Sequence, residues 1–408
     1  MRTVSETSRI EDMPTEQMPL LDDLMPWSVP ALRLGRPWVV APEPGTLRAR
    51  WAALAGAQPA ERDRLFAPSR SRTPHTAVVA LPGQSTVTRG FAQLSGPCPE
   101  PVRVLHEPFD EQWILPDHRV IDQARPELWR VRGEQQVFLI EHGLGRGPTG
   151  PAVAASALLP QGASPGGRPG RIRPLFRRPG GVEPNVLPGL MPWLSARYGC
   201  DVTPAAVMSW VLAAARFGPA GCAVPLPRRS EHWRQGVVLG HRLLAVHLGG
   251  AAGEERPRLP GGRRPYVREA VPAHPEGLHY VAAEETLHLG SGRVSPVAAA
   301  AWDFQVSGVR VLERWFASRT AHRRADGLAA IAPAQWPQEW TSQLLNLIST
   351  LTLLAELAPK QAELTDEPGI TAEELHKAGL LPTPQTARRP ASVLDHREEG
   401  PDGQFALL

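Results

Sequence analysis

The pattern of apolar and polar residues predicts short helices and strands in the first third of the chain. Apolar positions recur at helical spacing in residues 47–56 (LRARWAALAG), and the final glycine predicts a helix stop. Residues 101–122 read as strand, turn and strand, and residues 134–141 (EQQVFLIE) predict a further strand. Prolines separate these elements, so this part is expected to mix short strands with short helices.

Longer helices are predicted in the second half of the chain. Thr203 offers an N-cap hydroxyl and Pro204 suits the first helical position, so a helix is expected to begin there and to end at Gly218. A second helix is predicted over residues 230–249, and it also ends at a glycine.

A strand-rich segment and a long helix follow. The segments PYVREAV, GLHYVAAEETLHLG and RVSPV predict strands, with a hairpin at residues 283–285. Residues 337–358 predict a long amphipathic helix, because apolar residues return to one face at every third or fourth position. These apolar residues are Leu344, Leu347, Ile348, Leu351 and Leu354.

The stretch over residues 300–320 (AAWDFQVSGVRVLERWFASRT) gathers aromatic and basic side chains around one glycine. Trp302 and Phe304 are predicted to lie on one face of a strand, and Gly308 to permit a tight turn with positive φ. A buried helix face follows, and we expect its aromatic side chains to lie in the core. The residues of this helix face are Val311, Leu312, Trp315 and Phe316.

Together these elements predict an α+β fold. A mixed strand and helix subdomain is expected over residues 25–150, and a helix-rich subdomain with a β-hairpin and a long C-terminal helix over residues 183–358. Residues 151–182 are basic and rich in Gly and Pro, which predicts a linker without regular structure. Residues 1–24 and 359–408 are predicted to be a flexible and a loosely ordered tail.

Composition favours a protein of the reducing cytoplasm. No apolar run approaches the roughly 20 residues that span a bilayer, and the N-terminus lacks an apolar signal core, so we expect a cytoplasmic protein without a membrane partner. Cys98, Cys200 and Cys222 are odd in number and far apart, which argues against a disulfide framework.

Arginine dominates the basic residues. The formal net charge is only +3, but Lys360 and Lys377 are the only lysines among 44 basic residues. Arginine presents a planar fork that suits phosphates and guanine edges. A GC-rich genome that favours arginine codons explains the same composition, so composition alone leaves both explanations open.

No complete catalytic motif occurs in the sequence. The glycines of residues 142–150 (HGLGRGPTG) follow a predicted strand, but the proline there would break the helix that a cofactor loop needs. The Asn/Asp-Pro-Pro-aromatic tetrapeptide of amino-methylating enzymes is absent from the sequence. A lysine beside a glycine-rich turn and a G-x-S-x-G elbow are absent too.

Two partial motifs for metal chemistry are explained without a metal. Asp117 and Glu127 have the order of nuclease carboxylates, but Trp129 stands where a lysine is needed, so we expect solvated or capping residues. The nearest approach to a metal site is spaced too widely for its side chains to converge. It comprises Cys222, His232, His241 and His247. We therefore predict no catalytic, cofactor-binding or metal-binding residues in this chain.

Recognition of a polyanion is the chemistry that remains. Each contact of an arginine with a phosphate adds salt-dependent affinity. A solvated connector, or a complement to a helix dipole, explains each arginine-rich segment taken alone, whereas three such segments together favour a polyanion partner. The candidate nucleic-acid-binding residues are Arg171, Arg173, Arg177, Arg178, Arg263, Arg264, Arg310, Arg314, Arg319, Arg323 and Arg324.

Five segments occur in an order that is typical of one protein family. They are MPWSVPALRLGRPWVVAPEPGTLRARWAAL, EPFDEQWILPDHRVID, RPLFRRPGGVEPNVLPGLMPWLSARYG, AVPAHPEGLHYVAAEETLHLGSGRVSPVAAAAWDFQVSGVRVLERWFASRT and LLNLISTLTLLAELAPKQAELTDE. Over residues 25–367 the chain resembles the C-terminal specificity region of type ISP restriction–modification enzymes. In that family, nuclease, helicase, adenine methyltransferase and target-recognition parts share one polypeptide. The residues that match its pattern in the aromatic stretch are Trp302, Phe304, Gly308, Val309, Val311, Leu312, Trp315 and Phe316.

The resemblance implies a DNA-recognition module of a system for adenine methylation and restriction. Double-stranded DNA would be its partner, and a separately encoded methyltransferase or helicase subunit would bind S-adenosylmethionine and carry the chemistry. The chain would then not be an enzyme on its own. The segment MSWVLAAARFGPAGCAVPL is shorter than the Tyr-rich helix and loop of relatives, so no contacts are carried over there.

Two alternatives stay open. The chain could be a divergent S-adenosylmethionine-dependent adenine methyltransferase with a cofactor site near residues 143–150. It could also be a scaffold that has kept the fold and lost the ability to bind DNA.

Overall fold

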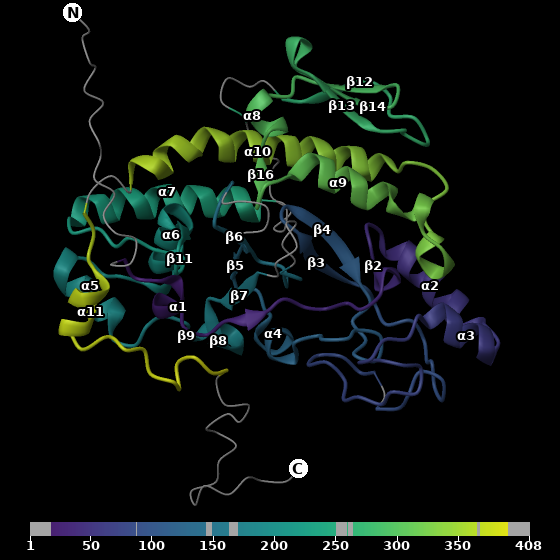
Figure 1. Ribbon diagram of the computed structural model, residues 1–408, viewed down its shortest axis with the longest axis horizontal. Helices are drawn as coiled ribbons and strands as arrows, with labels where there is room; N and C mark the ends of the chain where they lie inside the picture. Colours follow the sequence, from purple (N-terminus) through teal and green to yellow (C-terminus); the bar gives the residue numbers. More distant parts are fainter. Residues whose placement is uncertain are drawn as a thin grey trace, which may run out of the picture.

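The computed structural model shown in Figure 1 describes residues 18–86, 88–143, 149–162, 170–249, 259, 264–364 and 368–390. Helices and small separate sheets alternate along the chain, and the predicted α+β class is confirmed. The α-helices are α1 (Leu21–Leu24), α2 (Pro44–Gly56), α3 (Pro59–Phe66), α4 (Pro126–Val131), α5 (Leu190–Tyr198), α6 (Pro204–Ala214), α7 (Ser230–Leu248), α8 (Ala299–Trp302), α9 (Val311–Thr320), α10 (Gln338–Glu363) and α11 (Ala372–Lys377).

Two antiparallel sheets lie side by side in the body of the protein. The first has four strands in the order β1 (Val29–Pro30), β7 (Arg171–Pro174), β5 (Phe138–Glu141) and β6 (Val153–Ser156). The second has three strands in the order β2 (Val40–Ala41), β4 (Asp110–Ile114) and β3 (Val102–Glu107). Strands β3, β4 and β5 confirm the strands predicted in this part of the chain. The two-stranded pairs are β8 (Phe176–Arg178) with β9 (Val182–Pro184), β10 (Arg216–Gly218) with β11 (Gly221–Ala223), and β16 (Gln305–Val306) with β17 (Val309–Arg310).

A second four-stranded sheet, which we call the upper sheet, lies across α10 from the body in Figure 1. Its order is β12 (Tyr266–Glu269), β15 (Gly292–Ser295), β14 (Thr286–Leu289) and β13 (Leu278–Val281). Strands β13 and β14 form the predicted hairpin around Ala282–Glu284. Leu287, Leu289 and Val294 are fully buried and pack with apolar residues of α9 and α10, so this sheet is fixed to the helices by one face.

The long helix α10 follows its predicted pattern. All five predicted apolar positions are buried, and the helix continues through Pro359 to Glu363. In α6, the Thr203 hydroxyl accepts a hydrogen bond from the Ala206 amide at 3.2 Å, which confirms the predicted N-cap. Helix α6 ends at Ala214 rather than Gly218, because the residues that follow pair as β10 with β11. Among the described residues, no helix is both long and apolar enough to cross a membrane.

Three buried hydrophobic clusters hold these elements together. The first packs α1, α5, α6 and α7 against the end of α10, the second surrounds α2 and strands β2 to β4, and the third joins the upper sheet to α9 and α10. Leu139 and Val153 of the first sheet lie in the same cluster as Leu354 of α10. The division into subdomains stays a prediction, but buried contacts run across the boundary expected at residue 150.

Segments predicted to be loops or tails contain regular structure. Leu21 in α1 is fully buried, so the prediction of a flexible tail is wrong for residues 18–24. Strands β7 and β8 lie inside the predicted linker, because Ile172 enters the core between two arginines. Ile370 and Leu375 are buried, so the prediction of a loosely ordered tail is wrong for residues 368–390 as well. Parts of these predictions lie outside the described residues, namely 1–17, 163–169, 365–367 and 391–408.

The segment after α11 returns to α1. Arg388 donates to the carbonyl oxygen of Asp22 at 2.9 Å and pairs with the carboxylate of Asp23 at 2.9 Å. Arg177 of β8 donates to the carbonyl oxygens of Thr386 and Arg389 at 2.9 and 2.6 Å. The two ends of the described chain therefore meet beside β8.

The aromatic stretch differs in part from its prediction. Trp302 ends the short helix α8 and stacks on Tyr280, with ring centroids 5.4 Å apart, so it does not share a strand face with Phe304. Gly308 has a φ of 76° and makes the predicted turn between β16 and β17. Trp315 and Phe316 of α9 are buried, as predicted.

Helices α6 and α7 approach so closely that two positions require glycine. A Cβ on Gly240 would lie 1.9 Å from the carbonyl oxygen of Ser209, and a Cβ on Gly236 would lie 2.1 Å from the Trp210 ring. Neither distance allows two carbon or oxygen atoms to coexist, so any side chain would push the helices apart.

We expect Gly240→Ala to lower the free energy of unfolding by about 2 kcal/mol, the cost of forcing a methyl group into a packed interface. Gly56→Ala is the matched control, because nothing lies within 4 Å of its Cβ position at the end of α2. Chemical denaturation of both variants measures the difference. Equal stability of the two variants would contradict this account of the packing.

Candidate nucleic-acid interface

Two of the predicted contact residues, Arg173 and Arg319, are buried inside the protein. Arg173 is 1% exposed and pairs with Asp22 of α1 at 2.6 Å and with Glu141 of β5 at 2.7 Å. Arg319 is also 1% exposed and pairs with Asp110 of β4 at 2.5 Å. Each guanidinium joins elements that are far apart in the sequence, so both residues have structural roles in this conformation.

Arg310 and Arg314, at the start of α9, also have carboxylate partners. Arg314 donates to both oxygens of Glu107, at 2.6 and 2.7 Å, and this hydrogen bonding raises the pKa of Arg314. Arg310 pairs with Asp303 at 3.0 Å and with Glu313 at 3.2 Å. Their charges are compensated within the protein.

The remaining candidates near α9 lie around the upper sheet. Arg264 precedes β12 and is exposed, and Arg324 is exposed after α9. Arg323 is also exposed and donates to the carbonyl oxygen of Pro275, before β13, at 2.8 Å. We call Arg264, Arg323 and Arg324 the upper arginines. Arg263 lies outside the described residues.

Arg171 lies at the start of β7, and Arg177 and Arg178 lie on β8, which follows it along the chain. Arg171 is exposed, and its Nε donates to the Ser28 hydroxyl at 2.7 Å. Arg177 and Arg178 both pair with Glu183 of β9, the latter at 2.7 Å. The hairpin of β8 and β9 therefore presents two guanidinium groups around one carboxylate.

Four further arginines lie on segments that neighbour β7 and β8, namely Arg33, Arg125, Arg130 and Arg132. Arg33 and Gln123 form an isolated antiparallel bridge, and the Arg125 guanidinium donates to the Gln123 side-chain oxygen at 2.8 Å. Arg130 lies on α4, beside β8 (Figure 1), and Arg132 follows it. Only the pairing of β1 with β7 and the position of α4 bring these residues together, so sequence spacing gave no signal. We call the whole set the α4–β8 surface; it comprises Arg33, Arg125, Arg130, Arg132, Arg171, Arg177 and Arg178.

Positive charge prevails over this surface. Apart from the buried Arg173, residues 28–33, 123–134 and 171–183 contain seven arginines and three carboxylates. Within the described residues, Arg33, Arg130 and Arg132 have no carboxylate within 4 Å. Such a local excess of guanidinium groups is suited to a phosphate backbone.

The carboxylate of the partial nuclease motif has a structural role. Asp117 is fully buried, accepts a hydrogen bond from the Arg119 amide at 2.9 Å and pairs with the Arg119 guanidinium at 2.6 Å. It therefore caps a local turn, which agrees with one of the two predicted roles. In the described part of the chain, no group of three or more His, Cys, Asp or Glu residues converges as a metal site would require.

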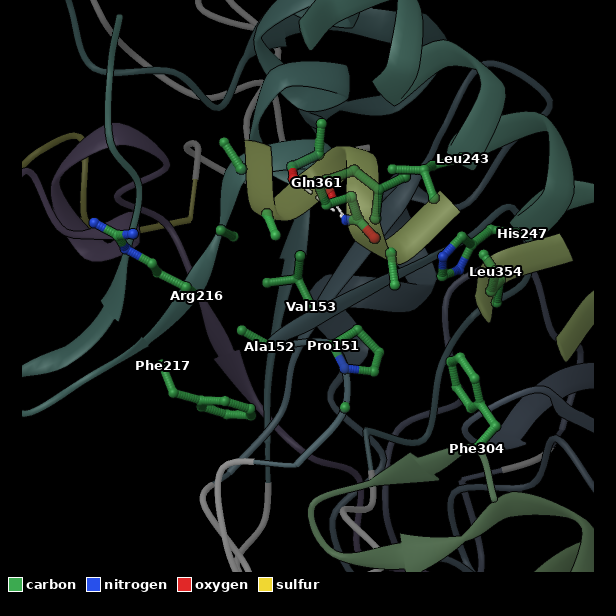
Figure 2. A pocket seen from close by; sticks show the side chains of 17 residues that line it. Pro151, Ala152, Val153, Arg216, Phe217, Leu243, His247, Phe304, Leu354 and Gln361 are labelled. Carbon is green, nitrogen blue, oxygen red and sulfur yellow. Dashed lines mark hydrogen bonds between the residues drawn. The ribbon is translucent and has the colours of Figure 1, made fainter. Parts of the chain in front are cut away.

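A cavity of about 480 Å³ lies where the end of α6 faces the ends of α7 and α10. Figure 2 shows Pro151, Ala152 and Val153 in the middle of the lining, with Phe217 and Phe304 on opposite sides of it. The walls are mostly apolar, and the polar side chains among them are Arg216, His247 and Gln361. His247 also lines a second cavity, of about 130 Å³, between β3, β4, α9 and α10.

Two neutral histidines lie near these cavities, His142 buried and His247 half-buried. Burial lowers the pKa of His142 to about 3, with a further contribution from His247, and burial lowers the pKa of His247 to about 4. His142 is 4% exposed, and both its ring nitrogens lack a hydrogen-bond partner among the described residues. Protonation of His142 would place an unsolvated charge in the core.

We expect stability to fall as the pH drops below about 6.5, the ordinary pKa of histidine. In that range the unfolded chain binds protons that the folded chain does not, so each buried histidine costs roughly 1 kcal/mol per pH unit until its own pKa is reached. His142→Leu removes one such proton and should flatten the dependence between pH 6 and about 4, as measured by urea denaturation at several pH values. His75→Leu supplies the comparison at an exposed histidine. An unchanged slope in His142→Leu would show that His142 is protonated in the folded state.

A family model and several solved structures match this chain. A family model described as the type ISP C-terminal specificity domain matches residues 23–218 and 220–347. The cryo-electron microscopy structure of a DrdV–DNA complex matches with a TM-score of 0.57 and 14% identity over 88% of this chain. The type ISP restriction–modification enzyme LlaBIII bound to DNA matches with a TM-score of 0.52 and 13% identity over 89% of this chain. A nuclease-deletion mutant of the type ISP enzyme LlaGI with a DNA substrate mimic matches with a TM-score of 0.50 and 12% identity over 85% of this chain.

These similarities concern the fold. The chain spans 39% of the DrdV chain, 24% of the LlaBIII chain and 28% of the LlaGI chain. No match is found among curated protein sequences. The chain and the three DNA-bound proteins therefore share an architecture at low sequence identity.

Proposed function

The chain belongs to the family of type ISP C-terminal specificity domains, and on this premise we propose that it binds double-stranded DNA and recognises a target sequence in it. The main support for the proposal is the α4–β8 surface. Some of its arginines have no carboxylate partner, and two others share a single carboxylate. The DNA complexes of DrdV, LlaBIII and LlaGI support it, because those proteins have the same fold.

The α4–β8 surface, whose arginines are exposed or half-buried, and the exposed upper arginines would have different tasks. Contacts with phosphates hold a protein in register on the duplex, whereas contacts with base edges read the sequence. The α4–β8 surface suits the first task, because its guanidinium groups come from three separate segments and follow no single helix or strand. The upper arginines lie around an exposed four-stranded sheet, and strands as well as helices are able to enter the major groove.

We propose that methyl transfer and DNA cleavage belong to a separately encoded methyltransferase and helicase subunit, which would bind S-adenosylmethionine. Gly150 supports this division of tasks. A Cβ there would lie 1.8 Å from the carbonyl oxygen of Gln305, so the glycine serves close packing against β16 rather than an open cofactor loop. This weighs against the alternative of a cofactor site at residues 143–150, of which 144–148 lie outside the described residues.

Calorimetry with S-adenosylmethionine separates the two functions. The chain alone is expected to give no heat of binding, since Gly150 at the end of the glycine-rich segment is packed against β16. A saturable isotherm would favour the divergent methyltransferase.

Arg171→Ala is expected to weaken duplex DNA binding severalfold for all sequences. One lost phosphate contact should also reduce the slope of log K against log salt concentration by about 1. Mobility-shift titrations at two salt concentrations measure both effects. Arg64→Ala is the matched control, because Arg64 is 76% exposed on α3 and belongs to neither surface.

The same titration with Arg323→Ala and Arg324→Ala tests the upper arginines. If these variants alone lose affinity, DNA lies on the upper side and the assignment to the α4–β8 surface is wrong. If the chain does not bind DNA, or if no variant changes its affinity, the scaffold alternative holds.

A further inference from the structure

The cavity between α6, α7 and α10 has no task in DNA binding through the arginine surfaces. We propose that it is a binding site for a neutral, planar heterocycle of nucleoside size, with a nucleobase as the chemical class. Its volume of about 480 Å³ lies in the range of small-molecule sites, and a mostly apolar wall with a few placed polar groups is typical of them.

His247 supplies a hydrogen-bond donor at one end of the cavity. Its Nδ1 accepts a hydrogen bond from the Ala155 amide at 3.3 Å, so the proton of the neutral ring is on Nε2. The ring is held by Phe109, whose centroid lies 5.2 Å away, and Phe109 in turn packs edge-on against Phe304 at 5.8 Å. The donor is therefore fixed in both tautomer and orientation.

Gln361 supplies an acceptor. Its Nε2 donates to the carbonyl oxygens of Leu212 and Ala213, both at 3.2 Å, in the last turn of α6, where carbonyls lack helical partners. These two bonds fix the amide, and Oε1 has no donor among the described residues. Figure 2 shows the side chain of Gln361 within the lining, with Leu243 and His247 beside it. A ring with both donor and acceptor atoms, such as a nucleobase, satisfies both groups.

The interior of the cavity is uncharged. Its lining contains no Asp, Glu or Lys. Arg216 is the one cation, but Figure 2 shows it directed away from the other labelled side chains, and its nearest partner is the sulfur of Met18 at 2.9 Å. A phosphate inside would be buried without a counter-charge, which is costly. The site therefore selects a nucleoside over a nucleotide.

Ala358 lines the cavity and is exposed on α10, as are Gly150 and Ala362 of the lining, so this side of the cavity is accessible to a ligand. The heterocycle has two sources, either a free nucleoside or an unpaired base of a bound DNA strand. The second source rests on the proposed function, whereas the first does not.

Titration calorimetry of the full chain with adenosine, guanosine, cytidine and thymidine tests the site without DNA. We expect at least one nucleoside to bind saturably and its 5′-monophosphate to bind at least tenfold more weakly. Ala358→Phe places a ring in the opening and should weaken binding at least tenfold. Lys360→Phe adds the same ring to the same helix outside the cavity and should leave the affinity unchanged. Thermal melting of both variants shows whether each is folded.

A duplex that contains 2-aminopurine distinguishes the sources. A rise in its fluorescence on adding protein, lost in Ala358→Phe and kept in Lys360→Phe, assigns the site to a base of the DNA. Nucleoside binding without such a rise assigns it to a free ligand. The proposal is overturned if no nucleoside binds and no fluorescence change depends on Ala358, or if monophosphates bind as tightly as nucleosides. The mobility-shift titrations do not depend on either result, so DNA binding is judged separately.

Discussion

Buried guanidinium groups connect the parts of this protein that are far apart in the sequence. Arg36, Arg50, Arg119, Arg173 and Arg319 are all 5% exposed or less. The Arg50 side chain on α2 donates to four carbonyl oxygens, those of Trp38, Val40, Ala329 and Ile331. Burial lowers its pKa to about 10, which still leaves it charged at neutral pH. A buried charge is tolerated only when its donors are satisfied, so these distant segments have to be in place together.

The need to satisfy a buried charge from several segments explains why these buried positions hold arginine rather than lysine. A guanidinium offers five donors in a rigid fork, and Arg50 and the two terminal nitrogens of Arg173 donate to groups from several segments. A lysine ammonium is a compact point charge that lacks this geometry. The arginine-rich composition therefore combines two populations, one inside the protein and one on its surface. Composition cannot separate them, because burial is decided by tertiary packing.

Sequence patterns correctly predicted features that depend on residues close together in the sequence. The apolar spacing of α10, the Thr203 cap and the turn at Gly308 are local signals, and each is present in the structure. The linker prediction failed because Gly and Pro hid a strand whose Ile172 is buried between Arg171 and Arg173. Trp302 was misplaced because the preceding alanines make a short helix instead of continuing a strand.

The candidate site was harder to predict than the fold. Arginines that are clustered in the sequence, such as those of α9, find carboxylates on β3 and β4 that lie about two hundred residues away. Arg33 and Arg130 are far from Arg171 in the sequence, and their segments come near β7 and β8 only through strand pairing and helix packing. The local density of arginine therefore did not predict which guanidinium groups remain without an acidic partner.

The described chain begins and ends beside β8, next to the arginines of the α4–β8 surface. Asp22 and Arg388 are in contact beside β8, and Arg177 of the α4–β8 surface binds the same segment. A separately encoded catalytic subunit that binds at this meeting point would lie next to the arginines. Its effective concentration at DNA held on that surface would be raised, as for any two linked binding modules.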